Sequence, residues 1–187
     1  MILIRAFIGI DFDSDCKKNI YELQQRFRKY AVKGRWKYID NFHLTLKFLD
    51  EISVMQEKQI DEAMRSICTE QKPFTLEITE PGIFEGKDAV RVLWLGLAGN
   101  LEILRHLAER IDKSFHKIGF PLEKRRYTPH VTIGQDIVFE CPFSQIRDSI
   151  GSIKSSPVLV NKLILFKSEQ LQNKRVYTPI SEYSLKP

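Results

Sequence analysis

Two short segments of the sequence place a histidine two residues before a threonine. Residues 42–46 read FHLTL, and residues 129–133 read PHVTI, so that His43 and Thr45 in one segment correspond to His130 and Thr132 in the other. Side chains on a β-strand alternate between its two faces. Each segment therefore predicts a strand with its histidine and threonine on a polar face and its aliphatic residues packed into the core.

Histidine and threonine at this spacing suit acid–base catalysis on a phosphate ester. Imidazole titrates near neutral pH, so one of His43 and His130 can accept a proton while the other donates one. The hydroxyls of Thr45 and Thr132 can donate hydrogen bonds to non-bridging phosphate oxygens as charge develops on them. The residues alone do not say which histidine is the acid and which the base.

The repetition of the pattern distinguishes it from an ordinary structural histidine. A lone histidine of this kind is more often a half-buried strand residue bonded to a nearby hydroxyl. The chain has four histidines, and two of them carry the same threonine spacing. The other two, His106 and His116, lie in a helical pattern without a threonine partner, and we assign them no catalytic role.

Neither the composition nor the motifs indicate a metal or another cofactor. Neither motif is a His-x-His pair, and no carboxylate stands at a ligand spacing from either histidine. The three cysteines, Cys16, Cys68 and Cys141, form no CxxC pair and are typical of a reducing cytoplasm. The net charge of +5 weakly favours a polyanionic ligand such as RNA or a nucleotide. No apolar run approaches the roughly 20 residues that cross a membrane.

Hydrophobic periodicity predicts a mixture of helices and strands without regular alternation, which favours an α+β fold. We expect one compact domain over residues 1–187, with two lobes that each carry one histidine motif. Pro81-Gly82 is expected to form a turn between two strands, with a further loop around Gly86. The expected strands are residues 2–10, 74–79, 89–97, 129–133, 158–166 and 175–185, with an alternating segment at 35–49. The expected helices are one capped by Ser14, one opened by a Ser53–Gln56 capping box, one between Asn100 and Gly119, and one at 143–150.

The two motifs and their flanks resemble the bacterial and archaeal 2′-5′ RNA ligase family, also called RNA 2′,3′-cyclic phosphodiesterases, within the two-histidine phosphoesterase superfamily. The similarity spans most of the chain. It rests on residues 4–10, on Trp36 followed by residues 41–49, on residues 127–133, and on residues 163–169 followed by Tyr177.

The resemblance implies both a fold and an activity. The fold is bilobal, with two antiparallel β-sheets facing each other across a central groove and helices packed on the outside. The activity is metal-independent hydrolysis of a 2′,3′-cyclic phosphate on RNA or a nucleotide to a 2′-phosphate, with reversible 2′-5′ ligation as a further expectation. His43 would protonate the departing 3′ oxygen, and His130 would activate water. The protein would work as a monomer.

One departure from the family concerns the end of the second motif. Family members commonly carry an arginine in a Thr-Leu-Ala-Arg run, whereas this chain reads Thr132-Ile133-Gly134-Gln135. Arg126, in the basic run before the motif, could supply the missing positive charge, and Phe84 could stack on a base. A solvated basic turn and a packing aromatic are the competing interpretations.

Two other functions remain open at this point. A non-catalytic RNA-binding module would use charge and stacking and would not need paired imidazoles. A hydrolase of a small cyclic nucleotide or of a 2′-5′ oligoadenylate would use the same residues on a different substrate. The product formed from a cyclic phosphate, and its dependence on RNA length, would separate these alternatives.

Overall fold

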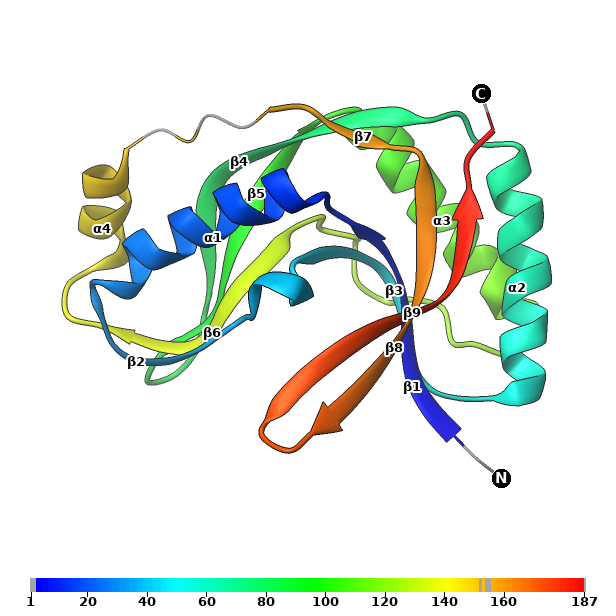
Figure 1. Ribbon diagram of the computed structural model, residues 1–187, viewed down its shortest axis with the longest axis horizontal. Helices are drawn as coiled ribbons and strands as arrows, with labels where there is room; N and C mark the ends of the chain where they lie inside the picture. Colours follow the sequence, from blue (N-terminus) through cyan, green and yellow to red (C-terminus); the bar gives the residue numbers. More distant parts are fainter. Residues whose placement is uncertain (1–2, 152, 154–155, 187) are drawn as a thin grey trace.

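The computed structural model describes residues 3–151, 153 and 156–186. Their strands form two antiparallel sheets, with orders β3-β1-β8-β9 and β2-β6-β5-β4-β7. The first sheet contains β1 (Leu3–Asp11), β3 (His43–Ser53), β8 (Lys162–Leu171) and β9 (Lys174–Ser184). The second contains β2 (Ala31–Trp36), β4 (Phe74–Glu85), β5 (Val90–Gly99), β6 (Val131–Phe139) and β7 (Val158–Val160). The α+β architecture expected from the sequence is confirmed (Figure 1).

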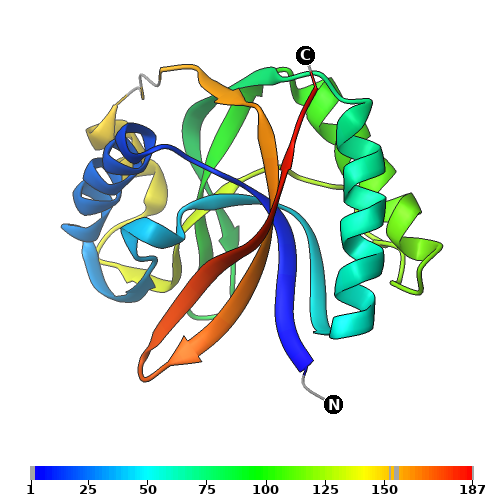
Figure 2. The ribbon, with the colours of Figure 1, turned by 45° about the vertical axis from the view of Figure 1, so that its right-hand side comes forward.

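The helices pack on the outer sides of the two sheets. The helices are α1 (Ser14–Arg28), α2 (Val54–Thr69), α3 (Leu101–His116) and α4 (Phe143–Ile150), with a short 3-10 helix η1 (Ile39–Asn41). Helices α2 and α3 lie together against the first sheet, as the turned view in Figure 2 shows. Helix α1 crosses the outer face of the second sheet and contacts α4. Among the described residues, no helix is long and apolar enough to cross a membrane.

The aliphatic residues of the two motifs anchor their strands in the core. Leu44 and Val131 are completely buried, as is Ile133, and Leu46 is nearly so. These side chains belong to one hydrophobic cluster that includes residues of both sheets. The histidines and threonines between them are only partly buried. The alternation predicted from the pattern is therefore present in both strands.

The capping signals are mostly where the sequence placed them. The Ser53–Gln56 capping box at the start of α2 is present, and Asn100 precedes α3. The cap of α1 differs from the prediction, because the side chain of Asp13, and not that of Ser14, accepts a hydrogen bond from the Cys16 backbone N–H at 2.7 Å. A carboxylate is also the better partner for the positive end of a helix dipole.

Three strand predictions are corrected by the structure. Pro81-Gly82 is not a turn but lies within β4, where the pairing with β5 shifts register, and the connection to β5 is the loop at Gly86. The segment predicted as one strand at residues 158–166 is divided at Asn161 between β7 of the second sheet and β8 of the first. The alternating segment at residues 35–49 likewise contains the end of β2, the helix η1 and most of β3.

Candidate active site

His43 is the first residue of β3, where that strand pairs with the end of β1. Its ring packs in a cluster with two aromatic rings, with centroid distances of 4.7 Å to Phe7 and 4.9 Å to Tyr177, whose own centroids are 5.0 Å apart. Nδ1 is 2.7 Å from the backbone carbonyl oxygen of Asn41, and Nε2 is 3.0 Å from Oγ1 of Thr45. An Nδ1–H that donates to the carbonyl leaves Nε2 as the reactive nitrogen.

His130 lies immediately before β6 and has the same backbone anchor. Its Nδ1 is 2.7 Å from the carbonyl oxygen of Thr128, again two residues earlier in the chain. Phe84 packs edge-on to the ring at 5.3 Å, and Trp94 lies at 6.3 Å between centroids. Both motifs thus orient the imidazole through Nδ1, and both direct Nε2 away from the backbone.

The two motifs face each other across the interior of the molecule. Strands β3 and β6 are in contact, although they belong to different sheets. The hydroxyl of Tyr127, three residues before His130, donates a 2.8 Å hydrogen bond to the backbone carbonyl of Thr45. The sequence placed these motifs in two lobes, and the structure brings the lobes together at the motifs.

The pKa of His43 is lower than that of an ordinary histidine. Loss of solvent lowers its pKa from 6.5 to about 4, and the hydrogen bond to the Asn41 carbonyl opposes this effect only in part. The positive charges of Lys37 and Lys17, and that of protonated His130, lower the pKa further. The contribution from His130 reflects how close the two motifs are. In the free protein His43 is therefore neutral at pH 7.

The two threonines differ in their surroundings. Oγ1 of Thr45 is within hydrogen-bonding distance of His43, whereas the hydroxyl of Thr132 has no hydrogen-bond partner among the described residues. Thr132 pairs across the strands with Trp94 of β5, so both side chains lie on the same face of the second sheet. This face is also the one on which His130 and Phe84 lie.

The two residues considered for substrate binding occupy different environments. Phe84 borders His130, so a ligand at that histidine would lie near its ring. Arg126 is exposed, and among the described residues its guanidinium makes no hydrogen bond with either histidine. Its backbone carbonyl accepts a 3.4 Å hydrogen bond from the Thr128 hydroxyl.

A cavity of about 560 Å³ holds functional candidates that the sequence analysis did not single out. None of the four motif residues lines it, but Phe7 and Tyr177, which pack against His43, do. Its lining comes from both sheets and includes Arg35, Lys37, Arg175, Phe7 and Tyr177. A basic and aromatic run at residues 35–38, RWKY, was visible in the sequence. Arg175 and Tyr177 are far from this run in the chain, and only the fold brings them to it.

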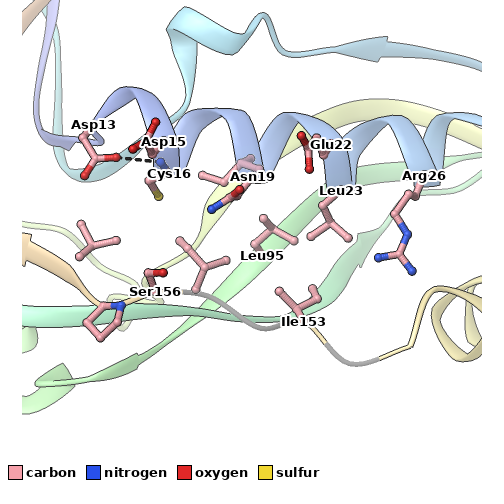
Figure 3. Close-up of a pocket in the computed structure, with 14 residues that line it drawn as sticks. Asp13, Asp15, Cys16, Asn19, Glu22, Leu23, Arg26, Leu95, Ile153 and Ser156 are labelled. Carbon is pink, nitrogen blue, oxygen red and sulfur yellow. Dashed lines mark hydrogen bonds between the residues drawn. The ribbon is translucent and has the colours of Figure 1, made fainter.

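A second cavity, of about 430 Å³, lies between α1 and the strands β4 and β5 (Figure 3). Cys16, Asn19, Glu22 and Arg26 of α1 line one side, and Leu95 lies opposite. Burial and the nearby Asp13 carboxylate raise the pKa of the Cys16 thiol to about 11, so that it is protonated and unreactive at neutral pH. None of the four motif residues lines this cavity.

The described residues contain no group of three or more histidine, cysteine or acidic side chains arranged to hold a metal ion. All three cysteines are free thiols. The side chains at the two motifs are imidazoles, which can transfer protons, and hydroxyl groups, which can donate hydrogen bonds.

Comparisons with known proteins identify the family. A sequence model of the 2′-5′ RNA ligase superfamily matches residues 15–170, which is most of the chain. The chain belongs to the 2′-5′ RNA ligase superfamily. The resemblance inferred from the two motifs is thus confirmed.

Two relatives and one solved structure match over nearly their whole length. The RNA 2′,3′-cyclic phosphodiesterase of Methanothermobacter thermautotrophicus is 26% identical, with 97% of this chain and 99% of the relative covered. The protein of the same name from Methanocaldococcus jannaschii is 29% identical, with 96% and 100% covered. The crystal structure of Escherichia coli LigT in complex with 3′-AMP is similar over 100% of both chains, with a TM-score of 0.81 and 26% identity.

Proposed function

We propose that this member of the 2′-5′ RNA ligase superfamily hydrolyses 2′,3′-cyclic phosphate ends of RNA to 2′-phosphates, with His43 and His130 as its acid and base. The observation that carries the proposal is the matched pair of imidazoles, each held through Nδ1 by the carbonyl two residues before it. The two relatives named RNA 2′,3′-cyclic phosphodiesterase support the same activity.

In the proposed reaction, neutral His130 accepts a proton from water as the water oxygen attacks phosphorus. The bond between phosphorus and the 3′ oxygen breaks, and protonated His43 transfers its proton to that oxygen. The hydroxyls of Thr45 and Thr132 donate hydrogen bonds to the non-bridging oxygens while negative charge accumulates there. The products are a 3′-hydroxyl and a 2′-phosphate, and proton exchange with solvent resets both histidines.

The low pKa of His43 makes its role as acid depend on the substrate. A free enzyme with a pKa of about 4 holds little protonated His43 at pH 7. A bound phosphate places a negative charge beside the ring, and an opposite charge within a few Å favours the protonated imidazole. Substrate binding therefore prepares the proton donor, and the empty site keeps it neutral.

The test is turnover of an RNA that ends in a 2′,3′-cyclic phosphate, measured with excess chelator. We expect His43→Ala and His130→Ala each to lower kcat by at least about 10²-fold, the usual scale for losing a general acid or base. His106→Ala, on an exposed face of α3, serves as the matched control and should retain full activity. The product should carry a 2′-phosphate.

Three outcomes would contradict the proposal. Near-full activity of either motif variant, with unchanged thermal melts, would remove the two-histidine mechanism. Strict dependence on added Mg²⁺ or Mn²⁺ would replace it with metal-assisted chemistry. Binding of RNA without any turnover would leave the non-catalytic alternative.

The same assay addresses the finer parts of the proposal. A 5′-hydroxyl can replace water in the same step: His130 accepts its proton as the 5′ oxygen attacks phosphorus, and His43 protonates the departing 3′ oxygen. A 2′-5′ linked product is therefore expected at high concentrations of both strands. Two further parts of the proposal rest on other observations. Both motifs come from one chain, which supports action as a monomer. The three free thiols support a location in a reducing cytoplasm.

A further inference from the structure

Three cationic side chains gather at one end of the space between the two sheets. Arg35 and Lys37 come from β2 and the residue after it, and Arg175 comes from β9. Nζ of Lys37 lies 6.0 Å from the ring centroid of Tyr177, and Tyr177 packs edge-on to His43. The cationic end of the cavity is therefore separated from the catalytic imidazole by one ring.

Two of these three charges have no ion-pair partner among the described residues. No carboxylate among the described residues lies within ion-pair distance of Lys37 or Arg175, whereas Arg35 pairs with Asp136. Burial lowers the pKa of Lys37, and the neighbouring charges of Arg35 and Arg175 lower it further. Holding like charges together costs free energy that a bound anion would recover.

Exposed aromatic rings border the same cavity. The Phe48 side chain is exposed (69% of the residue) and its ring lies 6.1 Å from that of Phe7. Tyr38 is also exposed, with the Lys174 ammonium 4.5 Å from its ring centroid. A groove with cations along it and flat rings at its edge fits single-stranded RNA, whose phosphates are negative and whose unpaired bases stack on aromatic side chains.

We propose that this cavity binds the nucleotides on the 5′ side of the reacting end, with Lys37 and Arg175 holding a backbone phosphate and Phe48 stacking on a base. The inference rests on the proposed function, because it takes the reacting phosphate to lie at His43 and His130. Its consequence is a preference for RNA chains over mononucleotides. The chain has Gln135 where the family resemblance leads one to expect an arginine. In this proposal Lys37, which follows β2, and Arg175 of β9 supply the positive charge instead, and Gln135 itself lines the cavity.

The first experiment compares two substrates, a nucleoside 2′,3′-cyclic phosphate and a pentanucleotide with the same end. The wild type should have the higher kcat/KM for the pentanucleotide. Lys37→Gln and Arg175→Gln should each reduce that preference by about 10-fold, the scale of a lost hydrogen bond between charged groups. Lys58→Gln removes the same charge from an exposed position on α2 and should retain the preference.

The second experiment measures binding without catalysis, by fluorescence anisotropy of a pentanucleotide that ends in a 3′-hydroxyl. The logarithm of affinity should fall linearly with the logarithm of salt concentration, with a slope of about −0.7 for each phosphate neutralised on a single strand. Losing one contact in Lys37→Gln or Arg175→Gln should reduce the slope by about 0.7. Phe48→Ala should weaken binding and leave the slope unchanged.

The two experiments separate failure of this subsite from failure of the proposed function. Equal kcat/KM values for both substrates, together with variants that match Lys58→Gln, would overturn the subsite and leave the hydrolase intact. Salt-dependent RNA binding that is lost in Lys37→Gln and Arg175→Gln, without hydrolysis of either substrate, would support the subsite and remove the proposed reaction. Thermal melts establish that each variant is folded.

Discussion

At the scale of single residues, the two histidines share an anchor but differ in their environment. His43 packs against Phe7 and Tyr177, close to the Lys37 charge, whereas His130 is bordered by Phe84 and Trp94. Paired titratable groups in unequal environments are the usual basis for dividing acid and base roles. The pattern of residues in the sequence is nearly symmetric, so this difference could not be predicted from it.

The buried imidazole of His43 predicts a pH dependence of stability. Above pH 6.5 the ring is neutral in both folded and unfolded protein, and its contribution to stability is fully present. As the pH falls from 6.5 towards 4, only the unfolded chain takes up the proton, which lowers the free energy of unfolding by up to about 1.4 kcal/mol per pH unit. Below about pH 4 both states are protonated and the loss stops growing.

Chemical denaturation at pH 6.5 and pH 4.5 measures this effect. We expect the wild type to lose about 2 kcal/mol more stability between these pH values than His43→Gln, in which the titrating ring is absent. His106→Gln, which removes an exposed imidazole, should follow the wild type. If the free energy of unfolding falls by the same amount in wild type and His43→Gln between the two pH values, burial does not lower the pKa of His43, and the prediction is wrong.

The two threonines are predicted to act on the transition state through their hydroxyls. Thr→Val at position 45 or 132 keeps the β-branched shape that a strand favours and deletes the hydroxyl. We expect each valine variant to lose roughly 10²- to 10³-fold, mainly in kcat and less in KM. Thr→Ser, which restores the hydroxyl, should recover most of the loss. A valine variant with wild-type kcat would assign its threonine a structural role.

At the scale of elements, local patterns predicted helices well and strand boundaries less well. The α2 capping box and the position of α4 depend on residues close together in the chain, and both were located correctly. Pro81-Gly82 looked like a turn, yet Gly82 is required inside β4 because the Trp94 ring covers it. A side chain there would come within 2.2 Å of that ring. The contact forms across strands and has no local signal.

The division at Asn161 has a similar origin. Residues 158–166 are apolar except for Asn161 and Lys162, and the segment was predicted as a single strand. In the structure Val158 pairs with Leu76 in the second sheet, whereas Ile164 pairs with Gly9 in the first. Hydrophobic periodicity in a sequence indicates which residues are buried, but it does not indicate which sheet a strand joins. The cationic cavity was missed for the same reason, since Lys37 and Arg175 meet only after β2 and β9 are placed.

At the scale of the whole molecule, the proposed reaction requires that two sheets hold their motifs at a fixed separation. Polar contacts connect distant parts of the chain around the site. The side chain of Asn41, beside His43, donates to the Arg175 carbonyl of β9, and Gln24 of α1 donates to the carbonyls of Lys37 and Ile133. The Tyr127 hydroxyl connects the segment before β6 to β3 of the other sheet. This last bond joins the two motifs directly.

Removing that bond is predicted to affect turnover more than folding. Burial raises the pKa of Tyr127, so its hydroxyl stays protonated and donates to the Thr45 carbonyl. Tyr127→Phe keeps the buried ring and should lower the free energy of unfolding by about 1 to 3 kcal/mol, because the carbonyl loses its partner. A small displacement between His43 and His130 should lower kcat by about 10²-fold. Tyr21→Phe, on an exposed face of α1, should change neither. If Tyr127→Phe loses stability but keeps its kcat, the packing of the two sheets alone would suffice to align the motifs.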